Sequence, residues 1–146
     1  QYEQLRERAD ELGSREPGRW IVLAFHSSME EVYAACDLVL ARSGASTVAE
    51  IAAARRASIL VPYPHHRDQH QLWNARELGE GAWIVAQDAW DRDASLRLID
   101  LLHDERSLET MGSCAAEQHR AGAASEIARE LMALATSSGR PGGSPA

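Results

Sequence analysis

A short polar segment, residues 42–50, has the composition of an anion-binding turn. It follows an apolar run and begins with Arg42-Ser43-Gly44, after which small residues lead into a helical pattern. Small residues let backbone N–H groups approach an anion closely, and the amino terminus of a helix attracts negative charge. The segment therefore predicts a diphosphate site. One turn further on, the carboxylate of Glu50 can accept hydrogen bonds from the vicinal hydroxyls of a ribose.

The same residues have a second interpretation that involves no ligand. Thr47 and Glu50 have the T-x-x-E spacing of a capping box, in which two side chains satisfy the exposed N–H groups of a helix start. A single Ser-Gly turn does not decide between a diphosphate site and such a cap. Both interpretations stay open on the sequence.

A second polar segment, residues 62–74, follows the next apolar run. His70, Gln71 and Asn74 carry hydrogen-bond donors and acceptors that can pair with sugar hydroxyls. The competing interpretation is a polar helix start on the surface. We predict that this segment binds a sugar.

The histidines of this segment also have the spacing of metal ligands. His66 and His70 are four residues apart, and His65 or Asp68 would supply a third ligand. Two prolines make helical phasing of His66 doubtful, and the sequence holds no second ligand cluster. We therefore predict neither a metal ion nor a cofactor.

Phe25 and His26 end the first apolar run of the chain. An aromatic face with exposed backbone beside it can hold a planar base, whereas packing of Phe25 in the core is the competing interpretation. No nucleophilic triad is indicated, because Ser43 lacks the G-x-S-x-G turn of a nucleophile elbow. The sequence assigns no catalytic residue.

Hydrophobic periodicity places these segments on a Rossmann-like α/β fold. Strands alternating with helices predict a parallel sheet covered on both faces by helices. In such sheets ligands bind beyond the carboxyl ends of the strands, so the loops after residues 25, 41 and 61 are the expected site. The predicted strands are 20–25, 37–41, 58–61 and 82–85, and the predicted helices are 2–12, 28–36, 47–55, 70–78 and three more beyond residue 93.

Length and composition describe one globular domain of 146 residues, 45% apolar and 25% charged. We place this domain at residues 1–136 and a disordered tail, rich in Gly, Ser and Pro, at residues 137–146. No run of 18 apolar residues is present, so no membrane span is expected. The first residues form neither a signal peptide nor an initiator, and we expect the chain to begin inside a longer gene product.

Charge and cysteine content exclude several classes of protein. The net charge is −7, and all 15 basic residues are Arg. The absence of Lys excludes P-loop and Schiff-base chemistry within this chain, and the acidic balance argues against a nucleic-acid partner. Cys36 and Cys114 lie far apart without a CxxC motif, which favours a reducing cytoplasmic setting.

Two long motifs resemble the MurG family of N-acetylglucosaminyltransferases. They are ACDLVLARSGASTVAEIAA at residues 35–53, then VPYP at 61–64 with DQHQLWNA at 68–75, in the family's order and spacing. The likeness extends from about residue 20 to residue 87 and implies the carboxy-terminal, donor-binding domain of a GT-B glycosyltransferase. The family transfers N-acetylglucosamine from its UDP-sugar to lipid I, giving lipid II, on the cytoplasmic face of the membrane.

The resemblance also implies roles for single residues. Phe25 and His26 would border the uracil, Ser46 and Thr47 would present backbone N–H groups to the diphosphate, Glu50 would hold the ribose, and His70 with Gln71 would hold sugar hydroxyls. Arg42, Ser43, Gly44 and Asn74 would have supporting roles. The implied reaction inverts the anomeric centre by direct displacement, with the departing UDP stabilised by helix dipoles and no bound metal.

The resemblance leaves part of the family's machinery unmatched. The amino-terminal domain, with the acceptor site and the presumed base, has no counterpart here, so a lipid-linked acceptor would bind through that missing domain. We expect this chain alone to transfer no sugar, and the full-length enzyme to be peripheral on the inner face of the cell membrane. An exposed sheet edge before residue 20 would favour self-association. Arg55-Arg56 stands where the family usually turns with Gly and Pro.

Two other interpretations stay open. In the first, the chain is the donor-binding domain of a related lipid glycosyltransferase that uses another UDP-sugar, because the uridine and diphosphate contacts would look the same. It would also suit a non-catalytic donor-binding subunit that requires a partner chain, as in the two-subunit N-acetylglucosaminyltransferase of the dolichol pathway.

Overall fold

The computed structural model describes residues 2–13, 20–65 and 68–138. The chain divides into two compact units, Gln1–Ala35 and Cys36–Ala146. The first unit contains helices α1, Tyr2–Gly13, and α2, Met29–Ala35. Both were predicted, and α2 begins as expected next to Ser28, whose carbonyl oxygen accepts a hydrogen bond from Glu31 N–H at 3.2 Å.

The strand predicted at residues 20–25 is wrong. These residues have no strand hydrogen bonding, and Phe25 is 82% exposed, so the alternative of Phe25 in the core is also wrong. A strand forms only when a neighbouring strand satisfies its N–H and C=O groups. Within the first unit the described residues supply no such neighbour, because its other elements are the helices α1 and α2.

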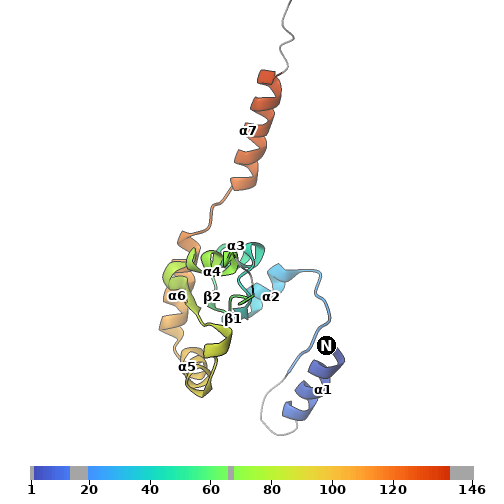
Figure 1. The fold of residues 1–146 in the computed structure, drawn as a ribbon, viewed down its shortest axis with the longest axis vertical. Helices are drawn as coiled ribbons and strands as arrows, with labels where there is room; N and C mark the ends of the chain where they lie inside the picture. The colour runs from blue at the N-terminus through green and yellow to red at the C-terminus, as the bar shows by residue number, and fades with distance from the viewer. Residues whose placement is uncertain (1, 14–19, 66–67, 139–146) are drawn as a thin grey trace, which may run out of the picture. The chain divides into compact units, whose positions relative to one another are not determined.

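The second unit, whose strands β1 and β2 are labelled in Figure 1, is built on a parallel sheet in the order β1-β2-β3. Its strands are β1, Leu38–Ala41, β2, Ala57–Leu60, and β3, Ala82–Ile84. Helix α3, Ala45–Ala54, connects β1 to β2, while α4, His70–Arg76, and the 3-10 turn η1, Gly79–Gly81, connect β2 to β3. The predicted parallel α/β architecture is confirmed for this unit.

The core of the second unit lies around the central strand. All four residues of β2 are buried. A strand that is buried on both faces is expected to be apolar along its length, and β2 has one exception, a serine. That serine, Ser58, satisfies its hydroxyl by donating to Gly81 O at 3.2 Å. Ile51, Leu78 and Ala115 complete the core from α3, from the α4–η1 connection and from the later helix α6, Glu105–Glu117.

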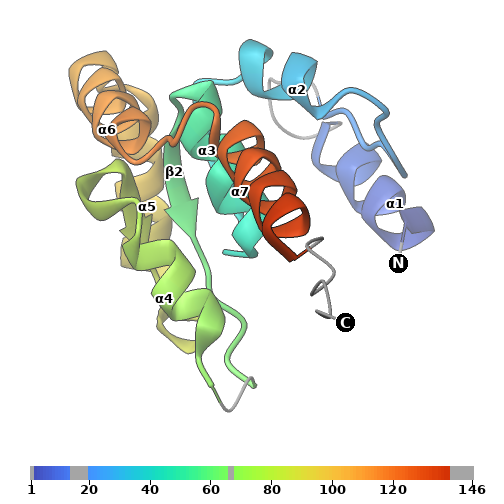
Figure 2. The same cartoon turned by 90° about the horizontal axis from the view of Figure 1, so that it is seen from above.

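Three helices follow β3. After the 3-10 turn η2, Gln87–Ala89, they are α5, Arg92–Leu102, α6, Glu105–Glu117, and α7, Ala123–Ser138. Asp91 and Asp104 cap α5 and α6 by accepting hydrogen bonds from Ala94 N–H and Ser107 N–H. Helix α6 packs against β2, α3 and η1 (Figure 2).

Two glycines let α6 lie this close to the sheet. A Cβ at Gly112 would lie 2.5 Å from Arg55 O, and a Cβ at Gly81 would lie 2.6 Å from Ala115 N. Both neighbours are backbone atoms, which cannot rotate away. Any larger residue would therefore push α6 off the sheet.

Helix α7 includes residues 137 and 138, which the sequence analysis assigned to the tail, and the remaining tail residues, 139–146, lie outside the described part of the chain. The apolar side chains of Ile127, Leu131 and Met132 on α7 are exposed. Within the described ranges, no helix combines the length and the apolar character needed to cross a membrane.

Candidate functional site

The candidate site lies where the three parallel strands end. Ala41 is in register with Leu60, and Leu60 with Ile84, so the loops that follow the strands leave the sheet along one edge. Backbone hydrogen bonds from Val61 N–H to Ala41 O and from Val85 N–H to Leu60 O, both at 2.9 Å, extend the pairing into these loops. The edge predicted to bind ligands is therefore held rigidly.

The turn after β1 presents the amino terminus of α3 at this edge. Gly44 is the N-cap residue, with φ −64° and ψ 149°, and its carbonyl accepts the first helical hydrogen bond from Val48 N–H at 3.0 Å. No side chain caps this helix end. The N–H groups of residues 45–47 precede the first helical bond and therefore point their partial positive charge out of the helix start.

The capping-box interpretation is wrong. Thr47 occupies the third helical position instead of the N-cap, because the helix begins at Ala45, two residues earlier than predicted. Ala has the highest helix propensity, and Gly is accepted at an N-cap, so the helix extends back to Gly44. Glu50 lies one turn beyond Ser46 on α3 and is exposed.

Ser43 and Asn74 join the turn to helix α4. Ser43 is completely buried, and its hydroxyl has no hydrogen-bond partner among the described residues. Its carbonyl oxygen accepts a hydrogen bond from Asn74 Nδ2 at 3.1 Å. Asn74 thus fixes the turn that precedes α3. The supporting role expected for both residues at the donor stays a prediction.

Arg42 connects the ends of all three strands. Its guanidinium donates to Val61 O at 3.1 Å and to Pro62 O at 3.2 Å, and a further N–H contacts Oε1 of Gln87. The guanidinium carbon also lies 5.6 Å from the centre of the Tyr63 ring. Arg42, which follows β1, therefore connects the loop after β2 and the loop after β3 to the end of β1.

Gln87 is a site residue that the sequence analysis did not find. It lines two hollows at the carboxyl edge, one of about 200 Å³ with Tyr63 and Leu72 and one of about 360 Å³ with Leu40 and Trp90. The predicted ligand-binding loops were only those after residues 25, 41 and 61. The sequence did contain a signal for Gln87, because a polar residue just past a strand lies at the edge of the sheet where ligands bind.

Helix α4 brings the predicted sugar-binding residues to the same edge. Gln71 Oε1 accepts a hydrogen bond from Tyr63 N–H at 2.9 Å. His70 Nδ1 lies 2.7 Å from Asp68 Oδ1, and this hydrogen bond lowers the pKa of the Asp68 carboxyl. Asp68 therefore orients the His70 ring, and the sequence analysis had considered Asp68 only as a metal ligand.

Phe25 and His26 belong to the first unit. The Phe25 side chain is exposed, and His26 Nδ1 accepts a hydrogen bond from Ser28 N–H at 3.2 Å. The role expected of them at a uracil stays a prediction. Among the described residues, which do not include His66, no group of three or more His, Cys, Asp or Glu side chains is arranged to hold a metal ion.

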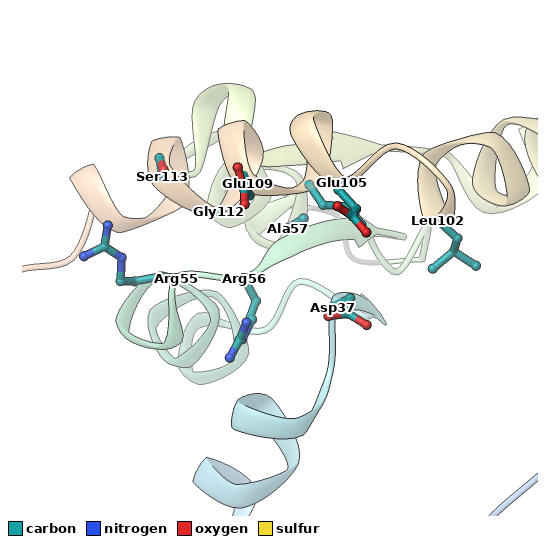
Figure 3. A pocket seen from close by; sticks show the side chains of 10 residues that line it. Asp37, Arg55, Arg56, Ala57, Leu102, Glu105, Glu109, Gly112 and Ser113 are labelled. Atoms are coloured by element: carbon teal, nitrogen blue, oxygen red, sulfur yellow. The ribbon is translucent and has the colours of Figure 1, made fainter.

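A further hollow, of about 590 Å³, lies at the opposite, amino end of the strands (Figure 3). Figure 3 shows carboxylates and guanidiniums of different elements around it. Because ligands of open α/β sheets bind at the carboxyl ends, we do not assign this hollow to the donor. Its charged side chains are Asp37, Arg55, Arg56, Glu105 and Glu109.

The parallel sheet and the helix start at its carboxyl edge define a Rossmann-like α/β domain. The sequence matches the description "Glycosyltransferase family 28 C-terminal domain" over residues 1–127. The chain therefore belongs to glycosyltransferase family 28, as the resemblance implied.

Curated relatives carry the name UDP-N-acetylglucosamine–N-acetylmuramyl-(pentapeptide) pyrophosphoryl-undecaprenol N-acetylglucosamine transferase. The protein of Chlorobium luteolum is 43% identical over 124 residues, which is 82% of this chain and 34% of the relative. That of Rhodospirillum centenum is 41% identical over 114 residues, covering 76% of this chain and 30% of the relative. The chain thus spans about a third of the length of these relatives.

A solved structure gives the same result. The crystal structure of MurG from Acinetobacter baumannii superposes with a TM-score of 0.79 at 28% sequence identity. The match covers 88% of this chain and 38% of that one. The fold described above is therefore that of part of a MurG protein.

Proposed function

We propose that this chain is the part of an inverting glycosyltransferase that binds UDP-N-acetylglucosamine, and that the whole enzyme converts lipid I to lipid II. The observation that carries the proposal is the uncapped amino terminus of α3 at the carboxyl edge of the sheet, with the polar residues of α4 beside it. A helix start of this kind binds phosphate groups. The names of the relatives supply the donor and the lipid-linked acceptor.

The proposed contacts divide the donor among three parts of the chain. The N–H groups of Ser46 and Thr47 bind the diphosphate, and Glu50 accepts hydrogen bonds from the ribose hydroxyls. His70 and Gln71 bind the sugar, while Asn74 supports the turn by its hydrogen bond to Ser43 O. The assignment of Phe25 and His26 to the uracil rests on the resemblance alone.

The proposed chemistry is a direct displacement at the anomeric carbon. Negative charge develops on the β-phosphate as UDP departs, and the N–H groups at the start of α3 stabilise it without moving. The acceptor site and the base would lie in a further domain, on the cytoplasmic face of the membrane. This chain by itself is then expected to bind the donor without transferring its sugar.

The sheet edge expected before residue 20 is absent, because residues 20–25 form no strand. A different open edge, that of β1, supports self-association of this chain when it stands alone. Strand β1 pairs with β2 on one side and with none of the described strands on the other, and Leu40 on it is 53% exposed. Unpaired N–H and C=O groups on an edge attract another strand. Light scattering over a concentration series tests this, and a mass that stays monomeric would contradict it.

The ribose contact gives a sharp test of the proposed function. We expect wild-type protein to bind UDP more tightly than 2′-deoxy-UDP in calorimetric titrations, and Glu50→Ala to weaken UDP binding by about 1–3 kcal/mol and remove that preference. Glu109→Ala, which removes the same charge from α6, is the matched control. Absence of UDP binding by the wild type would refute the proposed function. Equal UDP binding by Glu50→Ala would refute the ribose contact.

A further inference from the structure

Arg42 and Gln71 are linked through a single stretch of backbone. The Arg42 guanidinium donates to the carbonyl oxygens of Val61 and Pro62, at 3.1 and 3.2 Å. The next residue, Tyr63, donates its N–H to Gln71 Oε1 at 2.9 Å. Holding the two carbonyls therefore also holds the N–H group that contacts Gln71.

This link sets which end of the Gln71 carboxamide is available to a ligand. A backbone N–H can only donate, so the atom it contacts on Gln71 must be the acceptor oxygen. The other end of the carboxamide, Nε2, carries the donor hydrogens. Gln71 is thus held in the orientation in which it donates to an oxygen atom of the ligand.

We propose that Arg42 is a positioning residue for the sugar end of the donor, acting through the Pro62–Tyr63 backbone on Gln71. The inference rests on the proposed function and adds to it the polarity of one contact: Gln71 Nε2 donates to a hydroxyl or carbonyl oxygen of the sugar. Three protein oxygens already occupy donors of the Arg42 guanidinium, on Val61, Pro62 and Gln87. These contacts direct the guanidinium toward the two loops, and we assign it an indirect contribution to the sugar through the loop after β2.

The planar shape of the guanidinium is what this role requires. Arg presents several donors in a rigid fork, whereas Lys presents one ammonium at the end of a flexible stem. Arg42→Lys keeps the positive charge near the diphosphate and cannot reach all three oxygens at once. It separates the charge of Arg42 from its positioning of the loop.

The test compares UDP with UDP-N-acetylglucosamine in calorimetric titrations of the full chain. We expect Arg42→Lys to change UDP affinity by less than about twofold and to weaken UDP-N-acetylglucosamine about fivefold to tenfold, the size of one lost hydrogen bond. Gln71→Ala should show the same selective loss. The double variant Arg42→Lys/Gln71→Ala should lose no more than Gln71→Ala alone, because both changes remove one contact.

A second variant tests the polarity directly. Gln71→Glu keeps an oxygen that can accept from Tyr63 N–H and replaces the donor Nε2 by another oxygen. We expect it to lose the sugar contribution as Gln71→Ala does, with a melting temperature like that of the wild type. Retained preference for the sugar nucleotide in Gln71→Glu would overturn the assigned polarity.

Three results distinguish this inference from the proposed function. If the wild type binds neither ligand, the proposed function fails and the inference fails with it. If UDP binds and Arg42→Lys weakens both ligands equally, the donor site stands and the positioning role is refuted. Additive losses in the double variant would also refute it, since independent contacts add.

Discussion

Gly44→Ala is the most direct test of the anion site at the start of α3. Gly44 has φ −64° and ψ 149°, a conformation that any residue adopts, so the fold does not require glycine here. An added Cβ would meet only Thr47 Oγ1, at 3.8 Å, which is an ordinary contact. The methyl group would nevertheless stand at the end of the helix where the phosphate is proposed to bind.

The expected change in stability is small because two effects oppose each other. Replacing Gly by Ala where the backbone already suits Ala stabilises by about 0.4–1 kcal/mol, by restricting the unfolded chain. Ala is a poorer N-cap than Gly by roughly 0.5–1.5 kcal/mol. The net free energy of unfolding should therefore change by less than about 1 kcal/mol.

The expected change in binding is much larger. A methyl group that excludes one phosphate oxygen removes a charged hydrogen bond, which contributes about 1.5–3 kcal/mol. That corresponds to a UDP dissociation constant about 10 to 100 times higher. Calorimetric titration measures it, and thermal unfolding of the same sample measures stability.

Gly13→Ala at the end of α1 is the matched control, since its Cβ would also make an ordinary contact, with Trp20 Cδ1 at 3.7 Å. It should bind UDP like the wild type. Unchanged UDP affinity in Gly44→Ala would refute the placement of the diphosphate at α3. A large fall in its melting temperature would instead contradict the conformational argument.

Three further predictions concern stability. Arg55 ends α3 in the left-handed region, at φ 58° and ψ 45°, which glycine adopts more easily than arginine. Arg55→Gly should therefore stabilise the protein by about 1 kcal/mol in chemical denaturation. Arg56→Gly, at a residue without positive φ, should not stabilise it. Gly112→Ala should destabilise it by about 1–3 kcal/mol or more, because the new Cβ would lie 2.5 Å from Arg55 O, and a wild-type melting temperature would contradict this packing. Hydrogen bonds from Ser107 lower the pKa of Asp104, so the stability that this cap adds is complete above the ordinary carboxyl pKa and is lost as pH falls through the lowered value. The difference in melting temperature between wild type and Asp104→Ala should accordingly narrow in acid, and a difference independent of pH would count against it.

The sequence predicted correctly the strands that find a neighbouring strand among the described residues. Residues 37–41 and 58–61 were predicted as strands and pair with each other, because the helix between them returns the chain to the same sheet. Residues 20–25 have an equally apolar sequence and form no strand. Strand formation depends on a neighbour that periodicity does not describe.

The site shows the same limit at the level of single contacts. The spacing of His70, Gln71 and Asn74 along a helix that follows a strand was enough to predict that they lie at the carboxyl edge. It gave no indication that Gln87 would contact Arg42, because those residues are 45 positions apart and meet only through the parallel order of the strands. The start of α3 was predicted two residues too late. Thr47 and Glu50 fit the spacing of a capping box, but Gly44 is the N-cap residue and the helix begins at Ala45.

The close packing of α6 has a consequence for the order in which the second unit can fold. Strand β2 is buried on the finished sheet, yet one of the elements that packs on it, α6, is made from residues much later in the chain. During synthesis on a ribosome, β1, α3 and β2 emerge before the helix that completes their cover. The donor site is therefore expected to reach its final geometry only after residue 117 has left the exit tunnel, although no residue of α6 is proposed to touch the donor.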